Sequence, residues 1–455
     1  MARTSPIVAL HREAEASFAP YGPPDEGGVT VDVVQTYGEL ELEYAALRKK
    51  SILIDMPQRA VVQVSGPDRL EFLNRMVTQE LKGLEPFRVR RSFWLNRKGR
   101  IDADLRIIDL PHATYLEMDV HAVKRTVAGL RSFIVMEDAS ILDATETLHR
   151  LSIHGPTAID LFRGVAQPTT GAEASGPIID DLVEGFAVCV AIAGMEVVAY
   201  REDSAGEIGL ELIMPAEGAA KVFQRLLEMG HDPISHAEGA ALQRAKSASG
   251  GRGGRAPSFA ERVGLRPAGW HAYNIARIEA GTAMYNIDFG PDSLPAESGV
   301  ISDRVSFTKG CYLGQEVVAR MHSRGHPKQR LVAIKFEARI DQETGLPRLP
   351  MAGTLVQTVV SVAASAGVSA EASEAPAGSS GAPVGVTDGG PVGGQAVGVI
   401  TSSTLAPMVS SAPVAFAQVK YASSNEGTVL ESEPDHNGVR VRGVIQGKLG
   451  FWKRG

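Results

Sequence analysis

The chain has 455 residues, of which 44% are apolar and 22% are charged, and its formal net charge is −7. This length exceeds what one hydrophobic core supports, so two or three domains are expected, and the acidic balance excludes an overall positive field that would gather nucleic acid or acidic lipid. Two cysteines, Cys189 and Cys311, are too few for a disulfide framework or a paired metal site. The sequence shows neither a signal peptide nor an apolar run of membrane-spanning length, which predicts a cytoplasmic protein.

A strand, a Gly-Pro turn and a helix are predicted over residues 60–76, with Pro67 at the first helical position. The same order recurs further along the chain, where residues 151–153 precede Gly155, Pro156 and a second helix. The apolar residues expected to face the core from these two helices are Leu70, Phe72, Leu73, Met76, Ile159, Leu161 and Phe162. This repetition predicts two related α+β units.

Within the second unit, residues 194–203 and 207–215 alternate or cluster apolar residues as strands do. A helix is predicted over 216–230, opened by Pro215 and closed by a glycine. The glycine-rich, basic stretch at 247–258 is interpreted as a solvated linker in preference to an RNA-binding segment.

From Leu331 onward, short apolar runs separated by turn residues predict an all-β domain, most simply a small barrel. Residues 360–397 are dominated by Ala, Ser, Gly, Pro and Val, a composition that predicts a disordered insertion in a hairpin. The predicted architecture is therefore α+β units over residues 1–150 and 151–330, followed by an antiparallel β-barrel over 331–455.

The most informative stretch is KGCYLGQEVVAR at 309–320. Its first residues predict a loop, Gly314 permits a close approach, and a helix or strand is expected from there to Arg320. A thiol at Cys311, beside Lys309 and within reach of Arg320, would have a lowered pKa, as nucleophilic or redox chemistry requires. The alternative is that Cys311 is a small residue packed in a turn.

The octapeptide KGCYLGQE closely resembles the signature of the YgfZ family of folate-binding proteins, which are related to the T-protein, the aminomethyltransferase of the glycine cleavage system. Residues 276–289, ARIEAGTAMYNIDF, with LPAES at 294–298, and the segments LNRKGRIDADLRI and GEIGLELIMP are similar to this superfamily as well. The resemblance implies two α+β units and a C-terminal barrel around a central pocket that binds tetrahydrofolate or a one-carbon derivative.

The resemblance also implies which residues would bind folate. Glu211 matches the carboxylate that pairs with the pterin, although its residue type and place also suit a surface acid on an edge strand. Arg277 and Glu279 match an Arg-x-Glu pair in the site wall, where Arg277 would grip folate or bridge Glu279. Trp94 would stack on the pterin or lie in the core. The residues carried over from the octapeptide are Lys309, Tyr312, Gln315 and Glu316, with the thiol of Cys311 as a catalytic candidate.

One position departs from the T-protein pattern, which has two adjacent acids after an Asn-x-x-Gly segment. Here the residues are Asp102, Ala103 and Asp104, so the first acid of the pair is missing and Asp104 keeps the second position as a catalytic candidate. A positioned acid or base typically contributes about 100- to 10,000-fold to a rate. The loss of one carboxylate therefore favours the YgfZ interpretation over aminomethyl transfer.

Two further features are given ordinary interpretations. His322 and His326 are interpreted as loop residues, since Gly325 interrupts any helix that would align them and no third metal ligand is near. The nearby cations form a basic strip that would meet a polyglutamate tail or an RNA phosphate, or would simply be a solvated surface. This strip consists of Arg320, Arg324, Lys328 and Arg330.

The sequence thus supports three functional hypotheses. The first, implied by the YgfZ resemblance, is a folate-binding accessory protein that supports maturation or repair of an iron–sulfur client enzyme and thereby tRNA modification. The second is a tetrahydrofolate-dependent aminomethyltransferase, which requires a lipoyl carrier protein as partner. The third is an interaction scaffold without a ligand. None of them involves a membrane or a bound metal, and the sequence gives no strong signal for direct contact with nucleic acid.

Overall fold

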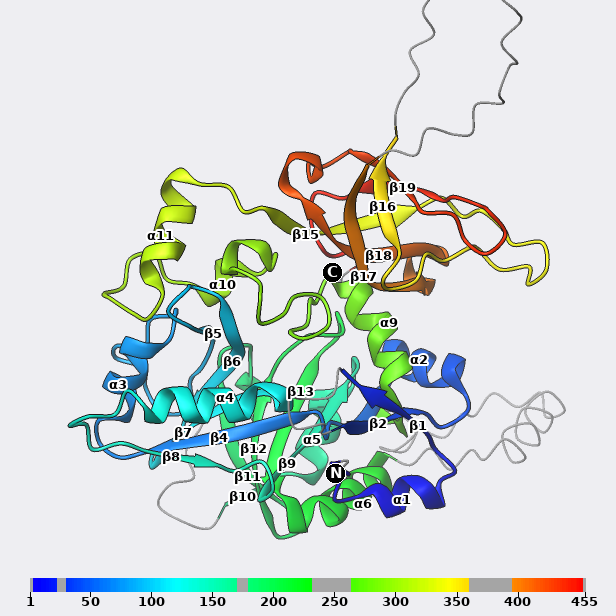
Figure 1. Ribbon diagram of the computed structural model, residues 1–455. Helices are drawn as coiled ribbons and strands as arrows, with labels where there is room; N and C mark the ends of the chain where they lie inside the picture. Colours follow the sequence, from blue (N-terminus) through cyan, green and yellow to red (C-terminus); the bar gives the residue numbers. More distant parts are fainter. Residues whose placement is uncertain (1–2, 23–29, 170–178, 231–262, 360–394, 453–455) are drawn as a thin grey trace, which may run out of the picture.

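The computed structural model describes residues 3–22, 30–169, 179–230, 263–359 and 395–452. The linker predicted at 247–258 and the insertion predicted at 360–397, apart from its last three residues, lie outside the described residues. Two sheets with their helices form the lower part of the molecule in Figure 1, and a β-barrel lies above them.

The first sheet has five antiparallel strands in the order β5-β6-β7-β4-β8. Its strands are β4 (Arg59–Ser65), β5 (Val89–Leu95), β6 (Ile101–Asp109), β7 (Ala113–Asp119) and β8 (Ser140–Asp143). Helices α3 (Arg69–Met76) and α4 (Val120–Arg131) pack on one face of the sheet, over the largest apolar cluster of the molecule.

The second sheet has seven strands in the order β10-β11-β12-β13-β9-β3-β14, and only β14 and β3 pair in parallel. Its strands are β3 (Ser51–Asp55), β9 (Leu148–His154), β10 (Gln167–Pro168), β11 (Ala187–Ile192), β12 (Met195–Arg201), β13 (Gly209–Pro215) and β14 (Leu265–Pro267). Helices α5 (Ala158–Val165) and α6 (Ala219–Gly230) cover its outer face. Residues 1–150 therefore contribute β3 to a sheet built mainly from later residues.

The inner faces of the two sheets pack against each other. Successive side chains on a strand point to opposite faces, so Ala103 and Leu105 of β6 join the core under α3 and α4 while Ile108 joins a second cluster. This second cluster also contains Ile213 of β13 and Val61 of β4, which places it between the sheets. Side chains that share the parity of Ile108 and Ile213 therefore point between the sheets.

The predicted pair of strand, Gly-Pro and helix units is present. β4 leads through Gly66 into α3, and β9 leads through Gly155 into α5. Both glycines have positive φ, +100° and +144°, and each backbone approaches a carbonyl oxygen of another segment closely. One detail of the prediction is wrong, because α3 begins at Arg69 and Pro67 lies in the turn before it.

The C-terminal region forms a closed six-stranded antiparallel barrel in the order β15-β18-β17-β16-β19-β20, which confirms the predicted α+β fold class with a C-terminal barrel. Its strands are β15 (Gln329–Phe336), β16 (Leu355–Thr358), β17 (Ala396–Ala406), β18 (Ala412–Lys420), β19 (Val429–Ser432) and β20 (Arg442–Ile445). The region between the second sheet and the barrel includes α10 (Ile301–Arg304) and α11 (Gln315–Arg324).

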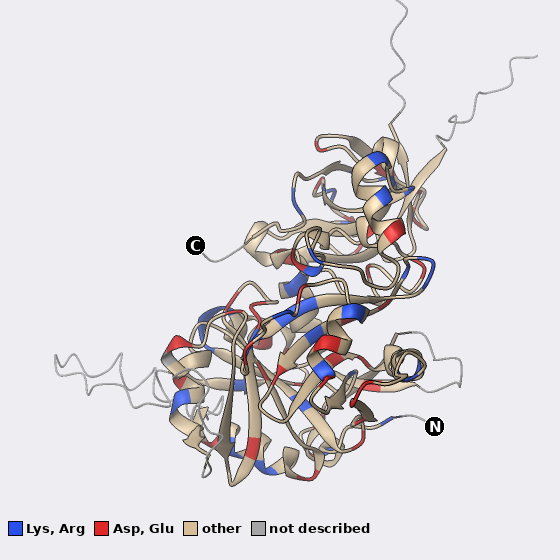
Figure 2. Cartoon of the chain, turned by 90° about the vertical axis from the view of Figure 1, so that its left-hand side faces the viewer, with Lys and Arg blue, Asp and Glu red and all other residues tan. Residues whose placement is uncertain are grey.

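Helix α9 (Trp270–Ala280) lies between the sheets and the barrel, in contact with α2 (Leu40–Lys49), with β17 and with the hairpin of β1 (Ser17–Tyr21) and β2 (Val31–Thr36). Near the N-terminus, α1 (Val8–Glu13) precedes this hairpin. Among the described helices, none combines the length and apolar character needed to cross a membrane. Figure 2 shows acidic and basic residues interleaved over the sheets and the barrel.

Candidate functional site

A polar cavity lies between the two sheets, bounded on one side by Tyr273 of α9 and by the loop after α9 up to Tyr285. Its volume is about 30 Å³, which suits water molecules better than an organic ring. Strands from both sheets contribute its charged lining residues, which are Arg59, Asp104, Arg106, Arg150, Glu202 and Glu211. The cavity therefore combines the inward-pointing side chains of β6, β9 and β13.

Glu117 on β7 holds two of these arginines together. Its two oxygens accept hydrogen bonds from Nε and Nη2 of Arg59, at 2.5 and 2.6 Å, and Oε1 also pairs with Arg150. Burial disfavours the ionised carboxylate, but Arg150 and Arg59 outweigh this effect and lower the pKa of Glu117. Since Arg150 belongs to β9 and Glu117 to β7, this ionic contact ties the second sheet to the first.

Asp104 is held in the same way on β6. Its Oδ1 accepts from Nε of Arg304 at 3.0 Å, and its Oδ2 accepts from Nη1 of Arg106 at 2.8 Å. Arg106 also forms a pair with Glu202, with contacts of 2.6 to 3.1 Å. Burial opposes ionisation of Asp104, but the guanidinium groups of Arg304 and Arg106 outweigh it and lower the pKa of its carboxyl.

Glu211 is the least satisfied of the charged groups in the cavity. It is 1% exposed, and its Oε2 accepts from Nε of Arg150 at 2.9 Å. Within the described residues, its Oε1 is buried without a hydrogen-bond partner, with Nε2 of His154 3.7 Å away, and the hydroxyl of the neighbouring Tyr200 on β12 has no partner either. A buried carboxylate oxygen without a donor is costly, so Oε1 marks the place where a ligand with N–H groups would be stabilised.

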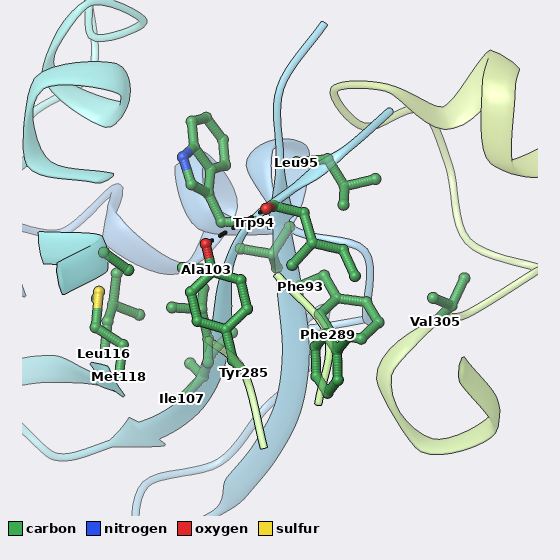
Figure 3. Packing of buried hydrophobic residues seen from close by; sticks show 14 of the residues in the cluster. Phe93, Trp94, Leu95, Ala103, Ile107, Leu116, Met118, Tyr285, Phe289 and Val305 are labelled. Atoms are coloured by element: carbon green, nitrogen blue, oxygen red, sulfur yellow. Dashed lines mark hydrogen bonds between the residues drawn. The ribbon is translucent and has the colours of Figure 1, made fainter. Parts of the chain in front are cut away.

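The position that departs from the T-protein pattern faces away from this cavity. Ala103 is fully buried among the apolar side chains under α3 and α4, and Figure 3 shows it beside Trp94, Ile107 and Leu116. A carboxylate at position 103 would lie in this apolar core, because only Asp104 and its alternate neighbours point between the sheets. The absence of an acid at position 103 therefore removes nothing from the cavity.

Trp94 lies in the same core. It is 2% exposed, meets Phe133 edge-to-face with ring centroids 6.1 Å apart, and packs over Gly129 of α4. It does not line the cavity between the sheets. The structure therefore places Trp94 in the apolar core. Stacking of Trp94 on a pterin stays a prediction.

Arg277 and Glu279 are buried on α9 and have protein partners at every charged group. Arg277 donates to Asp288, Ser402 and the carbonyl of Thr282 and pairs with Asp288 instead of Glu279. Glu279 accepts from Tyr44, Arg48 and the backbone N–H of Met408. Neither residue lines the cavity, so their predicted place in a folate-site wall stays a prediction.

The octapeptide forms the loop that leads into α11, outside the cavity between the sheets. Cys311 is exposed, whereas the Tyr312 side chain belongs to the large apolar core. Gln315 begins α11 and donates to the carbonyl of Gly310 at 3.4 Å, and Glu316 is exposed in the first helical turn. The binding and catalytic roles predicted for these residues stay predictions.

Lys309 joins the octapeptide to the end of α3. Its ammonium group donates to the carbonyl oxygens of Asn74, Val77 and Gln79 at 2.7 to 2.8 Å. Burial lowers the pKa of Lys309 to about 8, which leaves the ammonium form in excess at neutral pH. The motif lysine therefore satisfies three backbone acceptors.

Replacement of Lys309 by Met is expected to lower the free energy of unfolding by about 1–3 kcal/mol, because the three carbonyl groups lose their donor inside the protein. Chemical denaturation measures this change. The exposed Lys82 provides the control, since Lys82→Met removes the same charge from the surface. Equal stabilities of the two variants would show that Lys309 has no such structural role.

Comparison with known proteins shows which protein family this chain resembles. The protein-family model described as GCVT N-terminal domain matches residues 28–243, which include most of both sheets. The matched domain and the shared fold make this chain similar to proteins of the GcvT superfamily.

One curated relative is an aminomethyltransferase from Caldanaerobacter subterraneus subsp. tengcongensis, which is 24% identical over 311 residues; the match covers 67% of this chain and 70% of the relative. Another is an aminomethyltransferase from Cutibacterium acnes, which is 24% identical over 316 residues; this match covers 69% of this chain and 74% of the relative. The crystal structure of glycine cleavage system aminomethyltransferase T from Bartonella henselae shares the fold, with a TM-score of 0.70, 19% identity and coverage of 99% of this chain and 98% of that chain.

These findings correct the first functional hypothesis. The relatives are named aminomethyltransferases and the fold is that of the glycine cleavage T-protein, so the YgfZ-type accessory role with an iron–sulfur client and tRNA modification is wrong. That hypothesis rested on the resemblance of the octapeptide at 309–316, and Ala103, whose missing carboxylate weighed against aminomethyl transfer, points into the apolar core. The alternative hypothesis is the one that the relatives support.

The arginines of the cavity and the acids Glu202 and Glu117 that pair with them were not identified from the sequence. Arg106 lies between the apolar Leu105 and Ile107 of β6, and Arg150 precedes the apolar residues of β9. A charge inside an apolar strand is a signal for a buried ion pair, because such residues are rarely buried unless they are paired. The partners could not be assigned, since Glu117 and Arg150 meet only when the two sheets pack together.

Proposed function

We propose that this protein is a tetrahydrofolate-dependent aminomethyltransferase, which moves the methylene unit of an aminomethyl group on a dihydrolipoyl carrier protein to tetrahydrofolate, with release of ammonia and of the free dihydrolipoyl thiol. The observation that carries the proposal is Glu211, which lines the cavity between the sheets and whose Oε1 has no hydrogen-bond partner among the described residues. The names of the curated relatives and the shared fold support the same activity.

The chemistry of the cavity fits the edge of a pterin ring, because Oε1 of Glu211 can accept its N–H groups. The volume of about 30 Å³ is far below the roughly 300–1,000 Å³ of small-molecule sites. The ring can therefore enter only when lining side chains move. If the side chain of Arg150 moves, Oε2 of Glu211 also loses its partner and can bind the ligand together with Oε1. The displaced Arg150 can keep its ion pair with Glu117.

Tetrahydrofolate would supply the nitrogen that accepts the one-carbon unit. Asp104 stays ionised between Arg106 and Arg304, since both guanidinium groups lower its pKa. Because both oxygens of Asp104 already accept hydrogen bonds, we assign it the role of stabilising positive charge in the cavity, not that of accepting a proton. Glu211 orients the ligand through its free oxygen.

The first test is a calorimetric titration of the full chain with tetrahydrofolate and 5-formyl-tetrahydrofolate. Replacement of Glu211 by Gln is expected to weaken binding at least about tenfold, because hydrogen bonds to a charged group contribute about 1.5–3 kcal/mol. Glu217→Gln is the matched control, since Glu217 is exposed just after the same strand. Melting curves of both variants establish that each one is folded.

A transfer assay then decides between an enzyme and a binding protein. An aminomethyl-loaded lipoyl carrier protein and tetrahydrofolate are expected to yield methylene-tetrahydrofolate only when the protein is present. If the wild type binds neither folate, the network of paired charges is structural and the interaction scaffold becomes the better hypothesis. If it binds folate without transfer, the proposal is wrong in its catalytic part.

A further inference from the structure

A second pocket lies between α11 and the barrel, apart from the cavity between the sheets. Its volume is about 310 Å³, which falls in the range of roughly 300–1,000 Å³ found for small-molecule sites. The pocket is formed by the segment 294–296, by α10 and α11, and by Arg330 and Tyr421 at the edge of the barrel. None of its residues lines the cavity that contains Glu211.

The wall of this pocket is mostly apolar. Leu294, Pro295, Ile301, Val317 and Met321 come from three separate segments and face one another across it. The polar groups are few and lie on the side of the barrel and the end of α11. They are His322, Arg330 and Tyr421. An apolar wall with a few convergent polar groups is the usual composition of a ligand site.

Arg330 is the charged group of the pocket, and it has no carboxylate partner within the part of the chain that the structure describes. Among the described residues, its guanidinium makes one hydrogen bond, from Nη2 to the carbonyl oxygen of Ser424, at 3.1 Å. The guanidinium carries five N–H donors, so most of its donors remain available. This arrangement contrasts with the cavity between the sheets, where Arg59, Arg106 and Arg150 all pair with acids.

Aromatic stacking fixes the rim of the pocket. His322 stacks on Phe307 with ring centroids 3.9 Å apart, and His326 stacks on Tyr421 at 4.6 Å. These contacts hold the end of α11 and the edge of the barrel in defined positions. Arg330 therefore lies at the edge of a preformed apolar pocket. Because no local rearrangement is needed, binding of a ligand there costs less free energy.

We infer that this pocket binds an aliphatic carboxylate of medium chain length, with the carboxylate on Arg330 and the alkyl chain against Val317 and Met321. The charge of Arg330 selects an anion, and the apolar wall excludes a strongly hydrated ligand such as a polyglutamate chain. Part of the basic strip identified in the sequence therefore serves a pocket, while Arg324 and Lys328 are exposed beside it.

The test uses sodium octanoate in calorimetric titrations of the full chain, with octan-1-ol as the uncharged analogue. We expect saturable binding of one octanoate per chain. Arg330→Gln is expected to weaken octanoate at least about tenfold and to leave octanol unchanged, because only the carboxylate uses the guanidinium. Met321→Trp is expected to abolish binding of both compounds, since the larger side chain fills the apolar space.

Arg324→Gln is the matched control, because it removes the same charge from an exposed position at the end of α11, the helix that lines the pocket. It is expected to bind octanoate as the wild type does. The inference is overturned if the wild type shows no saturable binding, if Arg330→Gln binds octanoate normally, or if Arg324→Gln weakens it equally. Melting curves separate a blocked pocket from an unfolded variant, and the folate titration of the wild type is independent of every outcome.

Discussion

Replacement of Arg277 by Met is expected to lower the free energy of unfolding by about 3–5 kcal/mol. Arg277 is fully buried, and it is the partner of the equally buried Asp288, with 2.5 Å between Nη1 and Oδ2. Without the guanidinium, the carboxylate of Asp288 stays in the interior with only neutral donors from Met284, Thr401 and Ser402. Breaking one side of a buried pair is costly because the remaining charge loses its compensation.

Arg163→Met is the matched control for this measurement. Arg163 on α5 pairs with Asp160 at 2.7 Å, but both side chains are about half exposed, and exposed pairs contribute about 0–1 kcal/mol. Urea denaturation followed by circular dichroism gives both values. A loss below 1 kcal/mol for Arg277→Met would contradict the structural role and return Arg277 to the ligand-binding role implied by the family resemblance.

Gly155→Ala is expected to be about as destabilising, for a reason that lies in the backbone. The φ of Gly155 is +144°, which L residues rarely adopt, and a Cβ there would lie 2.1 Å from the carbonyl oxygen of Lys50. The strained backbone costs about 1–3 kcal/mol and the forced displacement of packed groups a similar amount. We therefore expect a loss of about 2–6 kcal/mol in the free energy of unfolding.

Gly194→Ala separates these two contributions. Gly194 also has a positive φ, +76°, but a Cβ there would have no atom within 4 Å. It should therefore cost only the backbone part, about 1–2 kcal/mol. Calorimetric melting of both variants measures the difference. If the two substitutions are equally harmful, the close approach of the chain at Lys50 contributes nothing to the effect.

The elements of the fold were largely predictable because they depend on local patterns. The Gly-Pro turns at Gly66 and Gly155 each stand between an apolar strand and an amphipathic helix, and the structure has both units. The short apolar runs after Leu331 predicted the barrel. The membership of β3 in the second sheet was not predictable, since its pairing with β9 depends on residues far away in the sequence.

The candidate site was predictable only in part. Asp104 and Glu211 were identified through the family resemblance, and both line the cavity. Their arginine partners were not identified, because the sequence does not say that Arg150 and Glu117 meet across two sheets. The inference that Ala103 weakens the case for aminomethyl transfer was wrong for a similar reason. The position of Ala103 in the sequence motif does not reveal that its side chain lies on the face of β6 that covers an apolar core.

Helix α9 links the barrel to the cavity that lies between the two sheets. Tyr273 of this helix bounds the cavity, while Arg277, one turn further on, is bound to Ser402 in the barrel strand β17. Arg277 also holds the carbonyl of Thr282, the first residue of the loop that bounds the cavity. An opening of the cavity that moved α9 would therefore also move the barrel strand β17, whereas a displacement of Arg150 alone would leave the barrel in place.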